Sequence, residues 1–303
     1  MIDERLLIDL EQLGNMPCPF IHSHTYDKAL ALAYSLSKGC CATNLQEVST
    51  VTATYKSSSH KNKWIKTTWL LKDDDVRTYI PHTKRFTKSN LSDMLNRYDT
   101  VFFKPTDGSG GAKIVKISKS DGKYIAKHDT TRREFSTQDS LVQWLKSFAS
   151  TRSFILQKGI ALAKSNGRPF DVRVMVQKTN AGVWEATALF CKVGLANKVT
   201  TNYNQGGSIK FIDSTLTGAG FNESQRSSIK DELRWLGVKV AKVFSKKSSG
   251  YRELGLDVAI DTTGRLWILE VNTRPQIYPL KNMNNGKLYR KILSYAKHYG
   301  RKS

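Results

Sequence analysis

The stretch GLDVAIDTTGRLWILEVN, residues 255–272, is the most informative part of the chain for its fold. Both halves are rich in apolar and β-branched residues, and Thr263-Gly264 separates them, which predicts an antiparallel hairpin. With a two-residue turn at that position, Ala259 faces Ile268 and Asp257 faces Glu270. A longer loop with a shifted register stays open, because Thr-Gly is not one of the strong hairpin turn pairs.

This register places two carboxylates directly opposite each other, with Cβ atoms about 4.5 to 5.5 Å apart, where like charges repel. Asn272 points to the same face as Glu270, because side chains alternate along a strand. Two acids and an amide oxygen on one face are a ligand set for a hard divalent cation such as Mg²⁺. The alternative is a surface hairpin with a solvated acidic face. The apolar neighbours Leu256 and Val271 argue against it.

A glycine-rich loop lies in VFFKPTDGSGGAKIVKI, residues 101–117, between two predicted strands. Walker and Rossmann loops both lead into a helix, so neither motif fits. The loop can turn backbone N–H groups toward phosphate oxygens at Gly108, Ser109, Gly110 and Gly111. Lys104, at the end of the preceding strand, can meet the same phosphates as a point charge. An ordinary turn is the alternative interpretation.

Composition favours anionic partners. The 303 residues include 48 Lys and Arg against 26 Asp and Glu, which gives a net charge of +22. Nucleotides, nucleic acid, an acidic peptide or polymer, and an anionic surface all suit such a field. No run of 18 apolar residues is present, so we expect no membrane span. The acidic, amphipathic start does not have the pattern of a secretory signal, which predicts a cytoplasmic protein with reduced cysteines.

The pattern along the chain predicts a mixed α+β fold with many hairpins and no regular βαβ alternation. Helices are expected at Tyr26 to Leu36, 88–98, Thr137 to Phe148 and about Glu223 to Phe244. Strands are expected at 100–104, 113–118, 123–128, 154–160, 171–177, 186–194, 255–261 and 266–272. We predict a small N-terminal domain at residues 1–77 and a larger domain at 78–303, divided into 78–158 and 159–303.

The C-terminal stretch 281–303 contains seven basic residues and no acid. Four apolar or aromatic residues share one helical face there, which predicts a docked helix with a basic outer side: Leu288, Ile292, Tyr295 and Tyr299. A solvated face that only aids solubility is the alternative to a patch that attracts an anionic substrate or surface.

Several segments together resemble one protein family. The segments are IPHTKRFT (80–87), FFKPTDGSGG (102–111), FILQKGIAL (154–162), GRPFDVRVMVQK (167–178), TNYNQGGS (201–208) and LEVNTRP (269–275). Their order is similar to that of the motifs of ATP-grasp ligases, and their amino-acid sequences resemble the YheC/YheD group of endospore coat-associated ATP-grasp proteins. The resemblance implies an ATP-grasp fold in which ATP lies between two α+β subdomains.

The resemblance also implies roles for individual residues. Lys104 and Lys66 would bind the α- and β-phosphates under the loop from Asp107 to Gly111. Backbone groups at the end of the 154–160 strand would bind adenine, namely those of Gln157, Lys158, Gly159 and Ile160. The other implied roles are neutralisation of the γ-phosphate and acyl phosphate by Arg173 and Lys192, phosphate or substrate binding by Asn202, and one or two Mg²⁺ ions on Asp257, Glu270 and Asn272. Gln276 and Lys158 depart from the family's pattern.

The implied activity is an ATP- and Mg²⁺-dependent carboxylate-amine ligase, acting through an acyl phosphate on an amino acid, a peptide or an acidic polymer. No protein nucleophile is required, so Cys191 is interpreted as structural. Arg173 and Lys192 each interrupt an apolar strand and need an anionic partner, either a substrate or an internal acid. The alternatives are a spore-coat-associated scaffold that binds nucleotide with little catalysis and, least favoured, a nucleic-acid-binding protein, for which no aromatic-basic motif is present.

Overall fold

The computed structural model describes residues 55–108, 113–195, 206–281, 283 and 286–301. The chain divides into two compact units, Met1–Val51 and Thr52–Ser303. The first unit, which contains the helix expected at Tyr26 to Leu36, lies outside the described residues. All elements named below belong to the second unit. The domain boundaries expected at residues 77 and 158 stay predictions.

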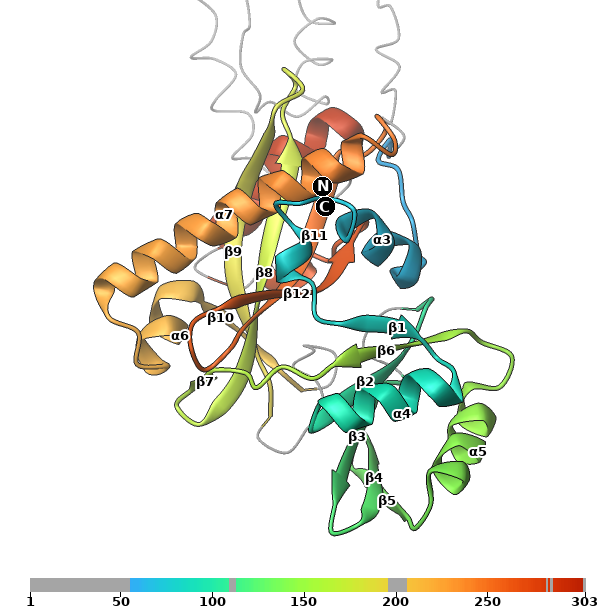
Figure 1. The fold of residues 1–303 in the computed structure, drawn as a ribbon. Helices are drawn as coiled ribbons and strands as arrows, with labels where there is room; N and C mark the ends of the chain where they lie inside the picture. The colour runs from blue at the N-terminus through green and yellow to red at the C-terminus, as the bar shows by residue number, and fades with distance from the viewer. Residues whose placement is uncertain (1–54, 109–112, 196–205, 282, 284–285, 302–303) are drawn as a thin grey trace, which may run out of the picture. The chain divides into compact units, whose positions relative to one another are not determined.

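Within the described residues, six antiparallel strands form a first sheet in the order β1-β6-β2-β3-β4-β5 (Figure 1). The strands are β1 (Thr83–Arg85), β2 (Thr100–Pro105), β3 (Val115–Ser120), β4 (Lys123–His128), β5 (Thr131–Phe135) and β6 (Phe154–Lys158). Two helices, α4 (Lys88–Arg97) and α5 (Gln138–Ala149), contribute apolar side chains to the same core as this sheet. The expected helices and strands of this region are therefore confirmed.

Each of these two helices begins at a threonine cap. The Thr87 hydroxyl accepts a hydrogen bond from the Asn90 amide at 3.0 Å, and the Thr137 hydroxyl accepts one from the Ser140 amide at 3.2 Å. Such caps satisfy amides that have no partner inside the helix. The inward residues of α4 are the ones that helical spacing predicted: Leu91, Met94 and Leu95.

A second antiparallel sheet, again within the described residues, has the order β10-β9-β8-β11-β12, with β7 paired to β8. Its strands are β7 (Lys164–Ser165), β8 (Arg168–Lys178), β9 (Trp184–Val193), β10 (Ser208–Phe211), β11 (Glu253–Ile260) and β12 (Leu266–Asn272). The strands expected in this part of the chain are all present. The short strands β7 and β10 were not expected from the sequence.

One face of the second sheet is apolar and packs against three helices, α3 (Lys63–Leu70), α6 (Ile212–Gly218) and α7 (Glu223–Ser245). Figure 1 shows α7 lying across β8 and β9. Helix α7 begins with a capping box in which Asn222 and Gln225 each bond the other's backbone amide. Its buried residues include all of those expected from helical spacing: Ile229, Leu233, Leu236, Val240 and Val243.

The opposite face of the second sheet packs against α8 (Lys287–Ala296) through Met175, Ala188 and Phe190. Short 3₁₀ turns η1 (Arg77–Tyr79), η3 (Tyr278–Leu280) and η5 (Lys297–Tyr299) complete the described elements. The docked C-terminal helix is confirmed, but its inner face differs from the expected one. Its buried residues are Tyr289, Ile292 and Ala296, and the helix gives way to a 3₁₀ turn before Tyr299, which is also buried.

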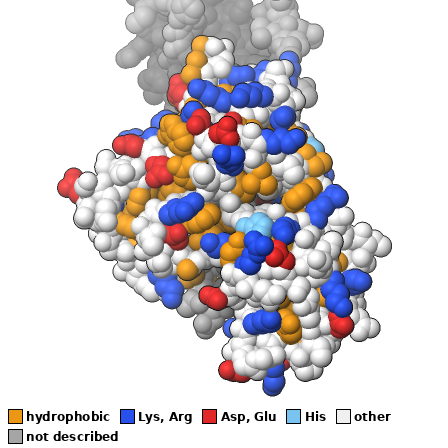
Figure 2. Space-filling view, viewed as in Figure 1, with side chains coloured by type: hydrophobic (Ala, Val, Ile, Leu, Met, Phe, Trp, Pro, Cys, Tyr) orange, Lys and Arg blue, Asp and Glu red, His pale blue; other side chains and the backbone are white. Residues whose placement is uncertain are grey.

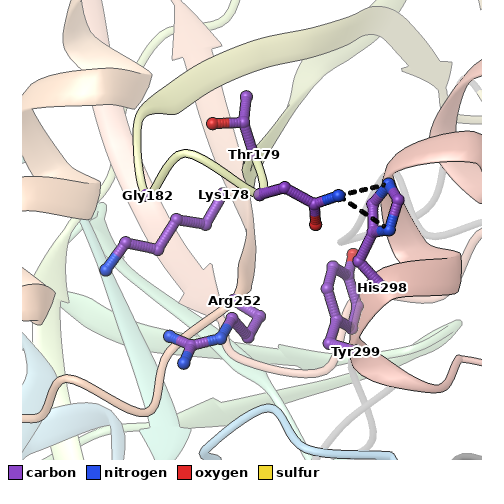
Figure 3. A pocket seen from close by; sticks show the side chains of 7 residues that line it. Lys178, Thr179, Gly182, Arg252, His298 and Tyr299 are labelled. Atoms are coloured by element: carbon purple, nitrogen blue, oxygen red, sulfur yellow. Dashed lines mark hydrogen bonds between the residues drawn. The ribbon is translucent and has the colours of Figure 1, made fainter.

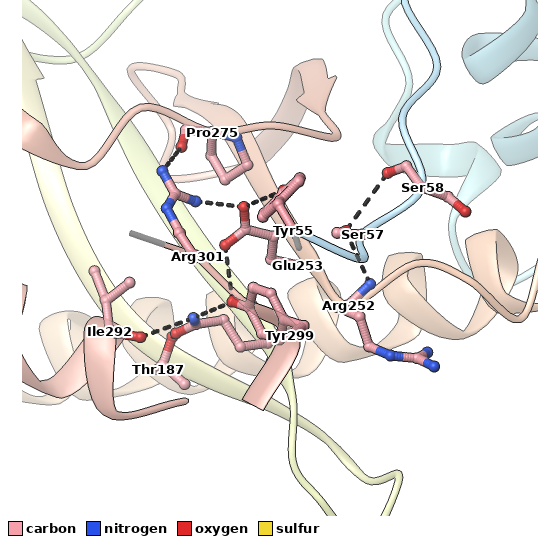
Figure 4. Close-up of polar contacts among 11 residues, drawn as sticks. Tyr55, Ser57, Ser58, Thr187, Arg252, Glu253, Pro275, Ile292, Tyr299 and Arg301 are labelled. Atoms are coloured by element: carbon pink, nitrogen blue, oxygen red, sulfur yellow. Dashed lines mark hydrogen bonds and ion pairs between the residues drawn. The ribbon is translucent and has the colours of Figure 1, made fainter. Parts of the chain in front are cut away.

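A buried carboxylate anchors the C-terminal end of the chain. Glu253 has an exposed fraction of 0% and accepts hydrogen bonds from the hydroxyls of Tyr55 at 2.7 Å and Tyr299 at 2.8 Å (Figure 4). The Arg301 guanidinium forms an ion pair with the same carboxylate and donates to the Pro275 carbonyl at 2.6 Å. We call these residues the Glu253 clasp, because they join four separate segments of the chain.

The two ends of the described chain lie side by side at this clasp. The Lys56 amide donates to the Tyr299 carbonyl at 2.9 Å. The rings of Tyr55 and Tyr299 meet edge to face, with their centroids 6.1 Å apart. The beginning and the end of the second unit are therefore fixed to each other by both backbone and side-chain contacts.

The surplus positive charge is dispersed on the face that Figure 2 presents. Lys and Arg side chains are scattered across that face with acidic side chains among them, and they do not gather into one stripe. No helix in the described part of the chain is long and apolar enough to cross a lipid bilayer.

Candidate active site

Asp257 is the centre of a charged cluster on the second sheet. It lies on β11, opposite Arg173 of β8 on one side and Glu270 of β12 on the other. Its Oδ1 atom is 2.7 Å from the Arg173 Nε and 3.0 Å from the Lys192 Nζ, and its Oδ2 accepts from the Asn272 Nδ2 at 3.2 Å. Burial opposes ionisation, but the two cations outweigh it and hold the pKa of Asp257 well below its usual range.

Lys192 joins a second acid to this cluster. Its Nζ is 2.8 Å from the Oδ1 of Asp171, the residue that faces it across the β8–β9 pair. Burial would lower the pKa of Lys192, but Asp171 and Asp257 outweigh burial and raise it. Asp257 similarly outweighs burial and raises the pKa of Arg173. Both basic residues thus have internal acidic partners in this state of the protein.

The facing of Asp257 and Glu270 is confirmed, and the same register holds for Leu256 with Val271. The register predicted nearer the turn is wrong. Ala259 faces Trp267 rather than Ile268, because one extra residue, Leu269, forms a β-bulge in β12. The loop is also longer than two residues, since the Asp261 amide donates to the Arg265 carbonyl at 3.0 Å.

The bulge decides which way Glu270 points. Leu266 and Ile268 enter the apolar core, and strict alternation would send Glu270 after them. Because Leu269 is inserted, Val271 takes the next core position, and Glu270 and Asn272 lie on the face of Asp257. Two residues of one strand can then join the charged cluster without burial in the core.

Helix α3 adds two lysines beside the hairpin. The Lys63 Nζ is 3.1 Å from the Glu270 Oε1 and donates to the Gly108 carbonyl at 2.7 Å. One turn later, the Lys66 Nζ donates to the Val271 carbonyl at 2.6 Å. Burial lowers the pKa of Lys66 to about 8, with Glu270 the largest opposing influence. Lys63 was not among the predicted site residues, although its i,i+3 spacing from Lys66 places both on one helical face.

Lys104 reaches the cluster from the first sheet. It lies on β2, and its Nζ donates to the Gln157 Oε1 of β6 at 2.6 Å. Burial lowers the pKa of Lys104 to about 8, and Glu270 and Asp257 act against that shift. The Lys63 Nζ contacts both Glu270 and the Gly108 carbonyl, so segments far apart in the sequence converge here.

The start of the glycine loop is tied to α3. The Lys63 amide donates to the Thr106 carbonyl at 2.7 Å, and the next two residues, Asp107 and Gly108, are exposed. Gly108 has φ of 127°, a conformation that favours glycine. The remaining predicted residues of the loop, Ser109, Gly110 and Gly111, lie outside the described residues, as does Asn202.

The predicted adenine hinge is already partly used by the fold. The Lys158 amide donates to the His82 carbonyl at 2.9 Å, and the Gly159 amide donates to the Thr100 carbonyl at 2.8 Å. The Lys158 Nζ lies 5.0 Å from the centroid of the Trp267 ring and 5.3 Å from that of Tyr98. These cation–π contacts connect the end of β6 with the second sheet.

A close approach of backbone and side chain supports the cluster. A Cβ atom at Gly255 would lie 2.6 Å from the Pro275 Cβ and 3.1 Å from the Arg173 Cδ. Only glycine therefore leaves room for Arg173 to lie against β11 beside Asp257. Among the described residues, no group of three or more His, Cys, Asp or Glu side chains forms a metal site. Asp257, Glu270 and the Asn272 amide offer oxygen atoms on one face of the hairpin.

A family model for YheC/D-like ATP-grasp proteins matches residues 53–301. The chain belongs to this family. The match confirms the predicted ATP-grasp fold, and the two antiparallel sheets with their helices confirm the predicted α+β class. The whole of the first compact unit lies outside the matched range.

Two curated proteins of Bacillus subtilis (strain 168) are similar to this ATP-grasp chain. The endospore coat-associated protein YheD is 28% identical over 221 residues, which cover 71% of this chain and 48% of YheD. The endospore coat-associated protein YheC is 24% identical over 219 residues, which cover 71% of this chain and 60% of YheC. The matched part thus spans about half the length of these relatives.

Among solved structures, the D-alanine-D-alanine ligase from Coxiella burnetii is similar to the chain at 12% identity and a TM-score of 0.44. The similarity covers 79% of this ATP-grasp chain and 57% of the ligase. A likeness of this size says nothing about substrates or activity.

Burial raises the pKa of the Cys191 thiol to about 12, which agrees with the interpretation of this residue as structural.

Proposed function

We propose that the chain is an ATP- and Mg²⁺-dependent carboxylate-amine ligase. The observation that carries the proposal is the surplus of cations in the cluster. Lys63, Arg173 and Lys192 form ion pairs with the acids Asp171, Asp257 and Glu270. Lys66 and Lys104 lie near these acids without a direct contact. Positive charges therefore outnumber negative charges in the cluster. Such a cluster favours a polyphosphate ligand.

The three lysines are the proposed phosphate ligands. Lys66 and Lys104 are protonated less readily than free lysine, because burial has removed water without supplying a carboxylate in direct contact. A bound polyphosphate would supply the missing negative charge. Lys63 already touches the carbonyl of Gly108 at the start of the glycine loop, so it connects that loop with Glu270.

Asp257, Glu270 and Asn272 are the proposed Mg²⁺ ligands. Their carboxylate and amide oxygens fit a hard divalent cation, and the bulge at Leu269 brings all three to one face. The two cations near Asp257 contact its Oδ1, whereas Oδ2 receives only the weaker amide contact from Asn272. When bound, Mg²⁺ would neutralise part of the charge on the phosphate oxygens.

Arg173 and Lys192 are the proposed catalytic residues. A substrate carboxylate attacks the γ-phosphorus, the bond to the β-γ bridging oxygen breaks, and ADP leaves. An amine then attacks the acyl carbon, phosphate leaves, and the amine loses one proton. The two cations stabilise negative charge on the transferred group, and their acidic partners Asp171 and Asp257 hold them in place.

Fewer backbone groups are left to bind adenine than the sequence suggested. Since the amides of Lys158 and Gly159 are bonded to His82 and Thr100, the contact falls to the Ile160 amide and to the carbonyls of this segment. Gln157 acts through its side chain, which is buried and holds Lys104 at 2.6 Å.

The test is ADP release in the presence of ATP and Mg²⁺ across a panel of amino acids, peptides and acidic polymers, each with and without an amine. We expect one carboxylate-amine pair to raise ADP release, and Glu270→Ala to abolish that rise. Glu134→Ala is the matched control, because Glu134 lies on β5 in the first sheet and pairs only with surface cations. ADP release that is equal in wild type and Glu270→Ala would remove the metal assignment.

The names of the two curated relatives support a second candidate, a coat-associated scaffold that binds nucleotide with little catalysis. The same panel separates the two candidates. Saturable binding of a non-hydrolysable ATP analogue, lost on chelation of Mg²⁺, together with no stimulated ADP release by any pair, would favour the scaffold. Association with the spore coat is part of this proposal, and its test is co-purification with coat material.

A further inference from the structure

A polar pocket lies at the end of the second sheet where β8 passes into β9 (Figure 3). Its volume is ≈ 180 Å³. The tips of two neighbouring strands and the turn after α8 supply its lining residues, which are Lys178, Thr179, Asn180, Gly182, Arg252, His298 and Tyr299. We call it the hairpin pocket.

The lining of the hairpin pocket is basic. It includes Lys178, Arg252 and His298, and none of the described residues that line it is an acid. Figure 3 shows the Lys178 ammonium and the Arg252 guanidinium on one side of the pocket and the His298 ring on the other. The Asn180 side-chain amide, 3.0 Å from the His298 Nδ1, adds a neutral donor. An anion placed in this pocket would therefore meet positive charge or N–H donors from several directions.

The frame of the pocket is held by hydrogen bonds. The Lys178 amide donates to the Arg252 carbonyl at 2.8 Å, which joins the two strands that carry the cations. The Arg252 Nη1 donates to the Ser249 carbonyl at 2.7 Å, so this guanidinium is already oriented. On the third side, Tyr299 is buried and belongs to the Glu253 clasp. A pre-oriented set of donors loses little entropy when a ligand binds.

The size of the pocket limits the class of ligand. It could hold a few waters at about 30 Å³ each, and it is smaller than the roughly 300 to 1,000 Å³ of pockets for drug-sized molecules. A small anion fits and a nucleotide does not. Two neighbouring cations attract a dianion more strongly than a monoanion, which favours phosphate over carboxylate.

We propose that the hairpin pocket binds a phosphate group. The site is separate from the candidate active site, because Lys178 lies five positions from Arg173 along β8, or roughly 17 Å at about 3.3 Å per residue. The phosphate can be free or part of a larger molecule, since the pocket is open to solvent at the exposed residues Asn180 and His298.

The experiment follows the ring signals of individual histidines by NMR in the full chain during titration with inorganic phosphate. The His298 signals, identified by their loss in His298→Gln, are expected to move and saturate. The signals of His82 and His128, which belong to the region of the first sheet, are expected to keep their chemical shifts. Sodium chloride at equal ionic strength is expected to move none of them. A second titration uses O-phosphoserine, and the tighter of the two ligands identifies free phosphate or a phosphate ester as the source.

The matched variants carry the same change of charge. Lys178→Gln with Arg252→Gln is expected to raise the apparent dissociation constant for phosphate about tenfold for each lost cation. Lys127→Gln with Arg133→Gln, exposed residues of the first sheet, is expected to leave it unchanged. Lys178→Gln alone is the second variant in case the double variant does not fold.

The proposal is overturned if the His298 signals do not saturate with either ligand, or if chloride moves them equally. It is also overturned if the pocket variants bind as tightly as wild type. None of these outcomes depends on ligase activity, so the proposal and the proposed function can fail separately.

Discussion

Two carboxylates of strand β11 lie on the same face of the second sheet and have different surroundings. Glu253 is completely buried and receives two tyrosine hydroxyls and one guanidinium. Asp257, four positions along, retains 13% exposure of its side chain and lies among Arg173, Lys192 and the more distant lysines. At Glu253 one negative charge meets one positive charge. Around Asp257 the positive charges are in surplus.

The difference separates a structural use of charge from a site that awaits a ligand. A balanced, fully hydrogen-bonded pair such as Glu253 and Arg301 needs nothing more, and loss of either partner leaves a buried charge alone. A cluster with surplus cations is satisfied only by an additional anion. We therefore expect variants at the clasp to change stability and variants at the cluster to change binding.

The largest expected effect is at the clasp. Arg301→Met removes the cation that pairs with the buried Glu253 side chain, which should lower the free energy of unfolding by about 3 to 5 kcal/mol. Urea denaturation measures the change. Lys297→Met is the control, because Lys297 is an exposed cation of the same C-terminal segment. Equal stability of Arg301→Met and wild type would show that the clasp is not a structural element.

Lys104→Met should have the opposite profile. The affinity for ATP with Mg²⁺ is expected to fall about tenfold to a hundredfold, as for the loss of a hydrogen bond to a charged group. The free energy of unfolding should stay equal or rise, because burial disfavours the charged form of this lysine.

Calorimetric titration and urea denaturation of the same samples test both parts of the Lys104→Met prediction. Lys119→Met, an exposed lysine of β3, is the matched control. A large loss of stability with unchanged affinity for ATP would reverse the assignment of Lys104 and place it with the structural charges.

A smaller effect is expected in the pH dependence of stability. The folded pKa of Lys104 and of Lys66 is about 8, below the ordinary value of 10.5. Between these values the unfolded chain binds more protons than the folded chain, so stability without nucleotide should rise with pH from about 8 to 10.5. The rise should be smaller in Lys104→Met than in Lys119→Met. Urea midpoints at several pH values measure it, and identical slopes in the two variants would contradict the shifted pKa.

The smallest expected effect concerns the exposed basic side of α8 and η5. Replacement of Lys287, Arg290, Lys291 and Lys297 by Gln should change stability by less than about 1 kcal/mol, since exposed charges contribute little. If this surface attracts an anionic substrate, the variant should have a higher KM at low salt and the same KM at high salt. The same KM in both proteins at both salt concentrations would leave the surface with only a solubilising role.

Local patterns were sufficient to predict the main elements. Helix α7 followed from Ile229, Leu233 and Leu236 at helical spacing, and the helices after Thr87 and Thr137 began where those caps stand. The facing of Asp257 and Glu270 also followed from a turn at Thr263-Gly264, because the bulge at Leu269 offsets the extra residue in the loop. In each case the residues that decide the structure are close together in the sequence.

Features that depend on distant contacts were not predictable. The bulge at Leu269 exists because both Ile268 and Val271 pack into the apolar core. That packing depends on the rest of the fold and cannot be read from the hairpin sequence alone. The Glu253 clasp joins residues 198 positions apart, and no local pattern signals such a contact. Lys63 could have been found from its spacing to Lys66, but its contact with Glu270 depends on how α3 packs.

The hydrogen bond between the Lys56 amide and the Tyr299 carbonyl has a consequence for chain topology. Because the two ends of the second unit touch, a short linker could join them, and new termini could be opened at an exposed turn such as the one between β4 and β5. The same adjacency allows the unit to be inserted as a cassette into a loop of another protein, since its entry and exit points nearly coincide. A circularly permuted chain of this kind would keep every contact of the charged cluster while changing the order in which its segments are synthesised.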